Sequence, residues 1–249
     1  ASRPERAGFE PEPFSLLYQR SLYQSIRAAV GRTFGLLEQR LGQRSEEDLA
    51  DRDIVALARE GLASRDRVIA RLSGLLSAKL SGRRIRTHGD YHLGQVLYTG
   101  RDFVLLDFEG EVERPLSERR LKRSPLRDVA SMLRSFHRAA QAAFFAERKR
   151  GMVQGAALTA LAGWLGHWER AAAAAFLRAY LERSRAGAAP YLPATREELS
   201  LWLDVYRLER AVSELAFELA SELNYRPDWI GVPLQGIRQV LGEPEGSRH

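Results

Sequence analysis

Apolar residues recur at helical spacing through the first third of the chain. Over residues 14–41 they return every three to five positions, which predicts an amphipathic helix with one buried stripe. A second helical stretch is expected over 45–80, with Gly61 and Gly74 as the positions at which it ends or bends. Residues 1–12 show no periodicity, and we expect them to be a lead-in linker.

The pattern then changes to short apolar runs bounded by polar residues. Val96–Tyr98 and Phe103–Leu106 are separated by the polar stretch 99–102, which predicts two strands joined as a β-hairpin. Arg84–Arg86 is expected to form a further short strand that leads into this region. The hairpin is the main β-structure that the sequence predicts.

Helical spacing returns after the hairpin and continues to the end of the chain. The charged stretch 111–124 is expected to be an ordered loop or a short helix. We predict four further helices, over 126–150, 156–185, 196–224 and 234–241. The fold class is therefore mainly α with a small β-hairpin (α+β). We expect one lobe over 13–249, made of a helical part (13–83), a loop and hairpin part (84–125) and a helical subdomain (126–249).

Composition and charge narrow the classes of function. The 249 residues are 45% apolar, which is enough for a substantial core. The net charge of +6 raises the possibility of nucleic-acid binding, and all but three of the 38 basic residues are arginine. These arginines alternate with acidic residues along the predicted helices and do not gather around aromatic platforms, so we expect no nucleic-acid partner.

Membrane insertion and cysteine chemistry are also not expected. No apolar run approaches the roughly 18 residues of a membrane span. There is no apolar signal region at the front of the sequence, and there are no cysteines for disulfides or thiolate metal sites. We therefore expect a cytoplasmic protein without a membrane partner.

Candidate chemistry gathers around the predicted hairpin. A hairpin brings the loop before its first strand close to the end of its second strand. Asp90, Gln95 and Asp107 should therefore converge. Phosphoryl transfer needs such a set, because a carboxylate must orient the acceptor hydroxyl and hard oxygen ligands must hold Mg²⁺ against the phosphates.

The spacing of these residues resembles a known family. His88-Gly89-Asp90, then Gln95, then Asp107-Phe108-Glu109 resembles the catalytic loop and metal loop of kinase-like phosphotransferases similar to aminoglycoside kinases, with glutamine in place of asparagine. The resemblance implies that Asp90 is the catalytic base. It also implies that Gln95 and Asp107 hold Mg²⁺ with ATP as co-substrate. Glu109 could support the metal through water, or it could be an exposed loop acid.

One branch of that family is closer. The runs HGDYHLGQVL, DFEGEVERPLSERR and SPLRDVASMLRSF resemble the maltokinases, including those fused to trehalose synthase. This implies phosphorylation of maltose on its anomeric hydroxyl to give maltose 1-phosphate, with a trehalose synthase domain or subunit as a possible partner. Residues 1–87 are predicted to be helical, and their only lysine, Lys79, lies on a helix. We therefore expect the carboxyl-terminal lobe of a protein-kinase-like fold, with the N-terminal nucleotide lobe missing from this chain.

Supporting roles are expected for several other residues. His88 is expected to bond the backbone near the metal loop. By resemblance, Asp128 is expected to accept hydrogen bonds from the backbone of the catalytic loop. His92 could contact the sugar. Three residues near the carboxyl end, Tyr206, Arg226 and Trp229, could also line a sugar site, or they could serve helix packing at the carboxyl end.

Some alternatives stay open from the sequence. His88, Asp90 and His92 also have the spacing of a transition-metal cluster. Arg127 could pair with Glu109, Glu111 or Glu113, or it could face solvent. His137 is expected at the surface or at its boundary. For the whole chain, the alternatives are phosphorylation of another sugar or small alcohol, or a non-catalytic helical module attached to trehalose synthase.

Overall fold

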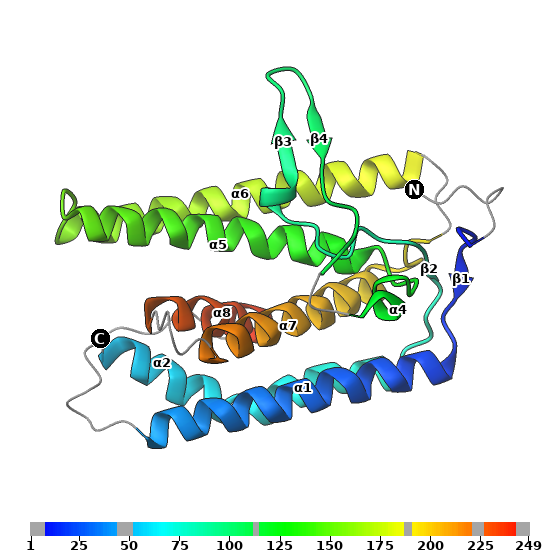
Figure 1. Ribbon diagram of the computed structural model, residues 1–249, viewed down its shortest axis with the longest axis horizontal. Coiled ribbons are helices and arrows are strands. Elements are labelled where there is room, and N and C mark those ends of the chain that lie inside the picture. Colours follow the sequence, from blue (N-terminus) through cyan, green and yellow to red (C-terminus); the bar gives the residue numbers. More distant parts are fainter. Residues whose placement is uncertain (1–7, 44–51, 112–114, 187–190, 221–226, 243–249) are drawn as a thin grey trace. The chain divides into compact units, whose positions relative to one another are not determined.

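The computed structural model describes residues 8–43, 52–111, 115–186, 191–220 and 227–242 (Figure 1). It confirms a mainly α fold with small antiparallel β-pairs. The helices are α1 (Leu16–Gly42), α2 (Arg52–Ala63), α3 (Arg65–Ser77), α4 (Leu116–Arg119), α5 (Leu126–Arg150), α6 (Ala156–Ala186), α7 (Arg196–Ala220) and α8 (Pro227–Leu241). None of the helices in these ranges has a stretch that is both long and apolar enough to cross a membrane.

The predicted helix over 45–80 is two helices in the structure. The break between α2 and α3 falls at Ser64, three residues after the predicted position at Gly61. The Ser64 hydroxyl donates to Gly61 O at 2.7 Å, so its side chain bonds the last turn of α2. Residues 44–51, the expected start of this stretch, lie outside the described residues. Helix α8 begins at Pro227, earlier than the predicted 234.

The chain forms two compact units, each made of segments that are distant in sequence. The first unit contains residues 1–14 and 80–203, and the second contains residues 15–79 and 204–249. The predicted subdivision at residues 83 and 126 follows sequence order, whereas these units join the front of the chain to later segments.

The first unit is organised around α5 and α6, which pack against each other (Figure 1). It also contains the antiparallel pair of β1 (Glu12–Pro13) and β2 (Arg83–Arg84), in which Glu12 faces Arg84. The Lys122 ammonium lies 2.8 Å from Glu12 Oε1 and adds an ion pair to this strand pair. The predicted linker therefore ends in a strand, because Glu12 pairs with residues that the sequence places far away.

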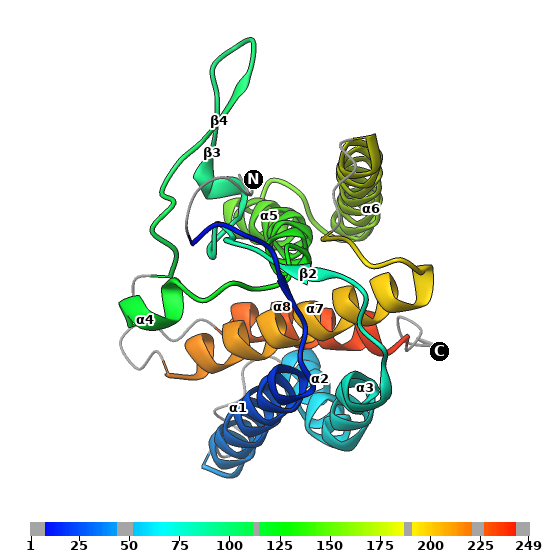
Figure 2. The ribbon, with the colours of Figure 1, turned by 90° about the vertical axis from the view of Figure 1, so that its right-hand side faces the viewer.

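The predicted hairpin is present in the first unit. β3 (Val96–Tyr98) pairs antiparallel with β4 (Phe103–Leu105), and both views show the hairpin projecting beyond α5 (Figures 1 and 2). The cross-strand rings of Tyr98 and Phe103 lie 5.1 Å apart. Both side chains are more than half exposed, at 61% and 65%, so this hairpin presents aromatic surface outward.

The second unit is a helical core made of α1, α2, α3 and α8 together with the later part of α7. Helices α1, α2 and α3 pack on one another, and α8 packs on α2 and α3 (Figure 2). The Gln19 amide of α1 donates to Leu75 O and Ala78 O at 3.1 and 2.9 Å, which ties α1 to the end of α3. The core side chains are apolar and fully buried, among them Val30, Phe34, Val68, Leu72, Leu75, Leu208 and Leu215.

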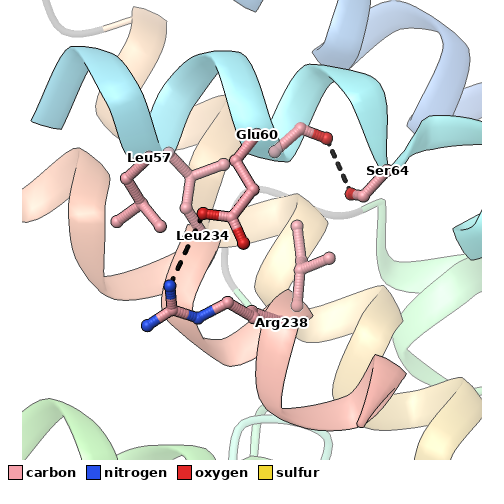
Figure 3. A pocket seen from close by; sticks show the side chains of 7 residues that line it. Leu57, Glu60, Ser64, Leu234 and Arg238 are labelled. Atoms are coloured by element: carbon pink, nitrogen blue, oxygen red, sulfur yellow. Dashed lines mark hydrogen bonds and ion pairs between the residues drawn. The ribbon is translucent and has the colours of Figure 1, made fainter. Parts of the chain in front are cut away.

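The contact between α2 and α8 depends on a glycine. A Cβ added at Gly61 would lie 2.5 Å from Leu234 Cδ2, too close for a real contact. Leu234 points toward α2 beside a small pocket, where Glu60 and Arg238 approach to 3.5 Å (Figure 3). Gly61 therefore stays inside α2 because its bare backbone accommodates Leu234.

Candidate active site

The expected catalytic loop begins at His88 and is held at the start of α5. Asp128, in the first turn of α5, accepts hydrogen bonds from His88 N at 2.7 Å and from Gly89 N at 3.1 Å. Burial raises the pKa of the Asp128 carboxyl, and the two backbone donors and Arg127 oppose this rise. One carboxylate therefore fixes two consecutive peptide groups of the loop.

His88 connects this loop to the strand that follows it. Its Nε2 lies 2.7 Å from Leu106 O, and its Nδ1 lies 3.4 Å from Asp90 N. Because the carbonyl can only accept and the amide can only donate, these partners favour the tautomer with its proton on Nε2. The ring is 9% exposed and lies against the ring of Phe108, with 4.9 Å between the centroids.

Two glycines allow the expected catalytic loop, which begins at His88, and the expected metal loop, which contains Asp107–Glu109, to approach each other. Gly89 and Gly110 have φ angles of +89° and +79°, a backbone region that other residues rarely adopt. A Cβ on Gly89 would lie 3.4 Å from Gly110 Cα, and one on Gly110 would lie 3.5 Å from His88 O. The backbones of the two loops are therefore in close contact at these positions.

Asp107 has an unusual backbone conformation. Its φ of +57° makes it the one non-glycine residue with positive φ among the described residues. Such strain often marks a functional position, and aspartate tolerates it better than most side chains. Its carboxylate Oδ2 accepts from Gln95 Nε2 at 2.9 Å, so the two expected metal ligands are in direct contact.

The donor chemistry at this pair fits Mg²⁺. The described residues contain no group of three or more acidic or histidine side chains arranged to hold a metal ion. Mg²⁺ does not need one, because it commonly uses one or two protein oxygens and takes its other ligands from phosphates and water. Asp107 offers an exposed carboxylate, and the Gln95 amide carries an oxygen beside the nitrogen that now faces Asp107.

Asp90 lies beside His92, with His92 Nε2 3.5 Å from Asp90 Oδ2. The other ring nitrogen of His92 accepts from Gly94 N at 3.0 Å and caps the short 3₁₀ helix η1 (Leu93–Gln95). The Asp90 side chain is 23% exposed and so remains accessible. The transition-metal alternative gains no support, because both ring nitrogens of His88 face backbone atoms and the described residues contain no group of three possible metal ligands.

Glu109 is held by a neighbouring arginine. Arg119 Nη1 donates to Glu109 O at 3.2 Å and lies 3.6 Å from Glu109 Oε2. The Glu109 side chain is 65% exposed, so it can reach solvent. This leaves both interpretations of Glu109 compatible with the structure.

Arg127 has contacts with both loops. Its Nη1 donates to Gly89 O at 3.1 Å, and its Nη2 donates to Glu111 Oε1 at 3.2 Å. Of the pairings left open by the sequence, the structure therefore contains the ion pair between Arg127 and Glu111. Glu113 lies outside the described residues.

The residues near the carboxyl end that are expected to contact sugar belong to the second unit, and their role stays a prediction. Tyr206 is 1% exposed, so its ring is part of the core, which supports helix packing as its role. Trp229 is half-buried on α8 and belongs, like Tyr206, to the second unit, whereas Asp90 belongs to the first. Arg226 lies outside the described residues.

Sequence reasoning missed a row of aromatic rings that starts next to Asp90. The Tyr91 ring lies 5.7 Å from His88 and 6.4 Å from Phe176, and Phe176 lies 5.9 Å from Phe136. Trp168 then contacts Phe136 at 6.2 Å. In the sequence, only the position of Tyr91 directly after Asp90 connects this row of rings to the site. The other rings come from α5 and α6, which are distant from Asp90 in the sequence.

His137 is also not where the sequence predicted. It is 2% exposed and its Nδ1 lies 3.0 Å from Glu169 Oε2, so it is a buried partner between α5 and α6. The expected surface position was wrong because the buried face of α5 extends to this position.

Solved structures with a similar fold include glucosamine kinases. Glucosamine kinase (crystal form B) matches with a TM-score of 0.70 and 21% identity over 94% of this chain and 48% of that chain. Glucosamine kinase in complex with glucosamine, ADP and inorganic phosphate matches with a TM-score of 0.69 and 20% identity, over 94% and 49%. The chain thus spans about half the length of these structures, in agreement with the helical lobe of a kinase-like fold.

A family model provides the assignment. The model described as the Phosphotransferase enzyme family matches residues 23–152, or 130 of the 249 residues. That range includes the catalytic loop, the hairpin, the metal loop and all of α5. This chain belongs to the phosphotransferase enzyme family.

Proposed function

We propose that this chain is the catalytic and acceptor-binding lobe of an ATP-dependent sugar kinase. The observation that carries the proposal is the contact between two loops. Asp90 lies on a loop held by Asp128, and Asp107, which contacts Gln95 just after that loop, lies on the loop that meets it at Gly89 and Gly110. Family membership supports phosphoryl transfer as the reaction.

In the proposed mechanism Asp90 orients the acceptor hydroxyl and takes its proton as the phosphoryl group is transferred. Asp107 and Gln95 would hold Mg²⁺, which neutralises charge on the phosphates when bound. His88 and Asp128 keep the loop that carries Asp90 in place. These residues contribute position and charge, which supply most of the catalysis in phosphoryl transfer.

The acceptor that we propose is maltose, phosphorylated on its anomeric hydroxyl. The resemblance of residues 88–136 to maltokinases supports it. The fold similarity to glucosamine kinase supports a kinase-like fold and leaves the acceptor to be tested. Another sugar or a small alcohol is the second candidate.

A nucleotide lobe upstream of this chain is part of the proposal. Within 8–79 the described residues (8–43 and 52–79) form helices and one short strand, and the single lysine of this range follows α3. The exposed aromatic face of the β3–β4 hairpin, with Tyr98 and Phe103, supports a cover from the nucleotide lobe of the same polypeptide. Apolar surface of this kind is more stable when it is removed from water.

The test uses the complete enzyme, ATP, Mg²⁺ and separate candidate acceptors: maltose, glucosamine and glucose. ³¹P NMR should show a new anomeric phosphate with maltose. Asp90→Asn should lower kcat by several orders of magnitude and leave the melting temperature and nucleotide affinity almost unchanged, because it removes the proton acceptor alone. Activity within tenfold of wild type would exclude Asp90 as the base.

A further inference from the structure

The guanidinium of Arg127 lies between the two loops of the candidate site. One of its nitrogens donates to Gly89 O in the catalytic loop at 3.1 Å. Another donates to Glu111 Oε1, just after the metal loop, at 3.2 Å. We infer that the Arg127–Glu111 pair is a clasp that sets the position of Asp90 relative to Asp107, and this inference rests on the proposed function.

The clasp is shielded from water. The Arg127 side chain is 9% exposed and the Glu111 side chain is 15% exposed. Charged hydrogen bonds in such surroundings are stronger and less screened by salt than those at the surface. The planar guanidinium has donors in a rigid fork, so it can hold two acceptors at a fixed separation, which a lysine ammonium cannot do as well.

The Gly89 residue is held from both sides. Asp128 accepts from Gly89 N at 3.1 Å, and Arg127 donates to Gly89 O at 3.1 Å. Both side chains come from the first turn of α5, so one rigid helix end restrains the residue directly before Asp90. Asp128 holds the catalytic loop only, whereas Arg127 also reaches the chain beyond the metal loop.

The restraint on the metal loop follows from its shape. Glu111 directly follows Gly110, whose backbone is packed against the catalytic loop near His88 O. Asp107 begins this turn in a conformation with positive φ. A displacement of Glu111 would therefore move a short, strained turn that carries Asp107 at its other end.

Phosphoryl transfer is sensitive to this geometry, because the hydroxyl and the phosphate must lie in line. A misplacement of about 1 Å can lower the rate roughly 10²-fold. Arg127 and Glu111 are thus positioning residues that act through Asp90 and Asp107 without contacting the reacting atoms.

The experiment compares Arg127→Lys, Glu111→Gln and the double variant in the complete enzyme. Lys122→Gln is the matched control, because it removes another ion pair of the first unit, at 2.8 Å, whose partner Glu12 belongs to neither loop. Hydrogen exchange without ligands should be at least about tenfold faster in Arg127→Lys for peptides that cover 88–95 and 106–111 alike. The Lys122→Gln control should leave both peptides unchanged.

Kinetics provide the second readout. Each single variant should lower kcat about 10²-fold, while KM for nucleotide and acceptor stays within threefold, because each loop still binds its own ligand. The double variant should be no slower than the slower single variant, because both changes open one clasp. Glu111→Gln keeps the bond from Arg127 to Gly89 O and serves if Arg127→Lys does not fold.

Three results would overturn the clasp: faster exchange in one loop only, additive losses of kcat, or a rise in KM without a fall in kcat. If the wild-type enzyme phosphorylates no sugar, the proposed function fails. The exchange measurement then still decides the clasp, because it needs neither substrate nor turnover.

Discussion

At the scale of single residues, the candidate site depends on a few backbone positions with unusual conformations. Gly89 and Gly110 allow the catalytic and metal loops to touch, and Asp107 has a φ of +57°. Short contacts to backbone atoms then orient side chains of the candidate site, as in the contact between His88 Nε2 and Leu106 O. Substitutions at such positions can therefore show whether a residue acts in ligand binding or in folding.

Asp107→Asn is the substitution that best separates metal binding from folding. Asparagine tolerates positive φ as well as aspartate does, so the free energy of unfolding should change by less than about 0.5 kcal/mol. The lost carboxylate should remove Mg²⁺-dependent nucleotide binding, because it is the charged member of the proposed ligand pair. Calorimetric titration of ADP with and without Mg²⁺ measures this. Unchanged affinity in Mg²⁺ would place the metal elsewhere.

A pH dependence is expected from Glu12 and Lys122. The hydrogen bond from Lys122 lowers the pKa of Glu12 below its ordinary value of 4.5. The folded state thus favours the carboxylate, so the stabilisation is fully present above pH 4.5 and is lost as the pH falls through the lower folded value. Lys122→Gln should lower the melting temperature slightly at pH 7, and the difference should vanish in acid. An equal difference at pH 3 would show that the pair is not its cause.

At the scale of helices and strands, close packing explains where elements end and which faces meet. The break at Ser64 separates α2 from α3, and Gly61 stays within α2 because Leu234 occupies the space of a side chain. A glycine in a helical sequence can thus mark a helix end or a close packing contact. Which of the two it marks depends on the residues that lie next to it in space.

Gly61→Ala should therefore destabilise the second unit by about 1–3 kcal/mol, the usual range for overpacking a core. Gly35→Ala in α1 is the matched control, because nothing lies within 4 Å of its added Cβ. That control should be neutral or stabilising by up to about 1 kcal/mol, since alanine is the better helix former. Urea denaturation of both variants measures the difference, and equal stabilities would contradict the packing argument.

At the scale of the whole molecule, the chain has helices with buried faces in each of its two units. Its length corresponds to about half of the glucosamine kinase structures that share its fold.

We predict that residues 1–249 alone are folded but do not phosphorylate maltose. All three lysines lie within the described residues and none of them lies on a strand, so we expect the γ-phosphate not to be held in line with the hydroxyl. Circular dichroism should show a cooperative helical melt. A coupled assay should show turnover only after the upstream segment is restored, and robust turnover by residues 1–249 would mean that nucleotide binds in another way.

The sequence by itself determined the extents of most helices, the hairpin and the order of the loop residues. These features depend on local spacing: α5 begins and ends within one residue of its predicted bounds, and Val96–Tyr98 pairs with Phe103–Leu105. The spacing of Asp90, Gln95 and Asp107 is likewise a local property, and it indicated phosphoryl transfer.

Only the tertiary structure decided which distant residues meet. It paired Arg127 with Glu111 among three candidate acids, buried Tyr206 and His137, and joined Glu12 to Arg84. The physical reason is that burial and ion pairing depend on which faces of separate segments pack together. Periodicity shows that a helix has an apolar face, but the partner of that face is chosen by contacts over the whole chain.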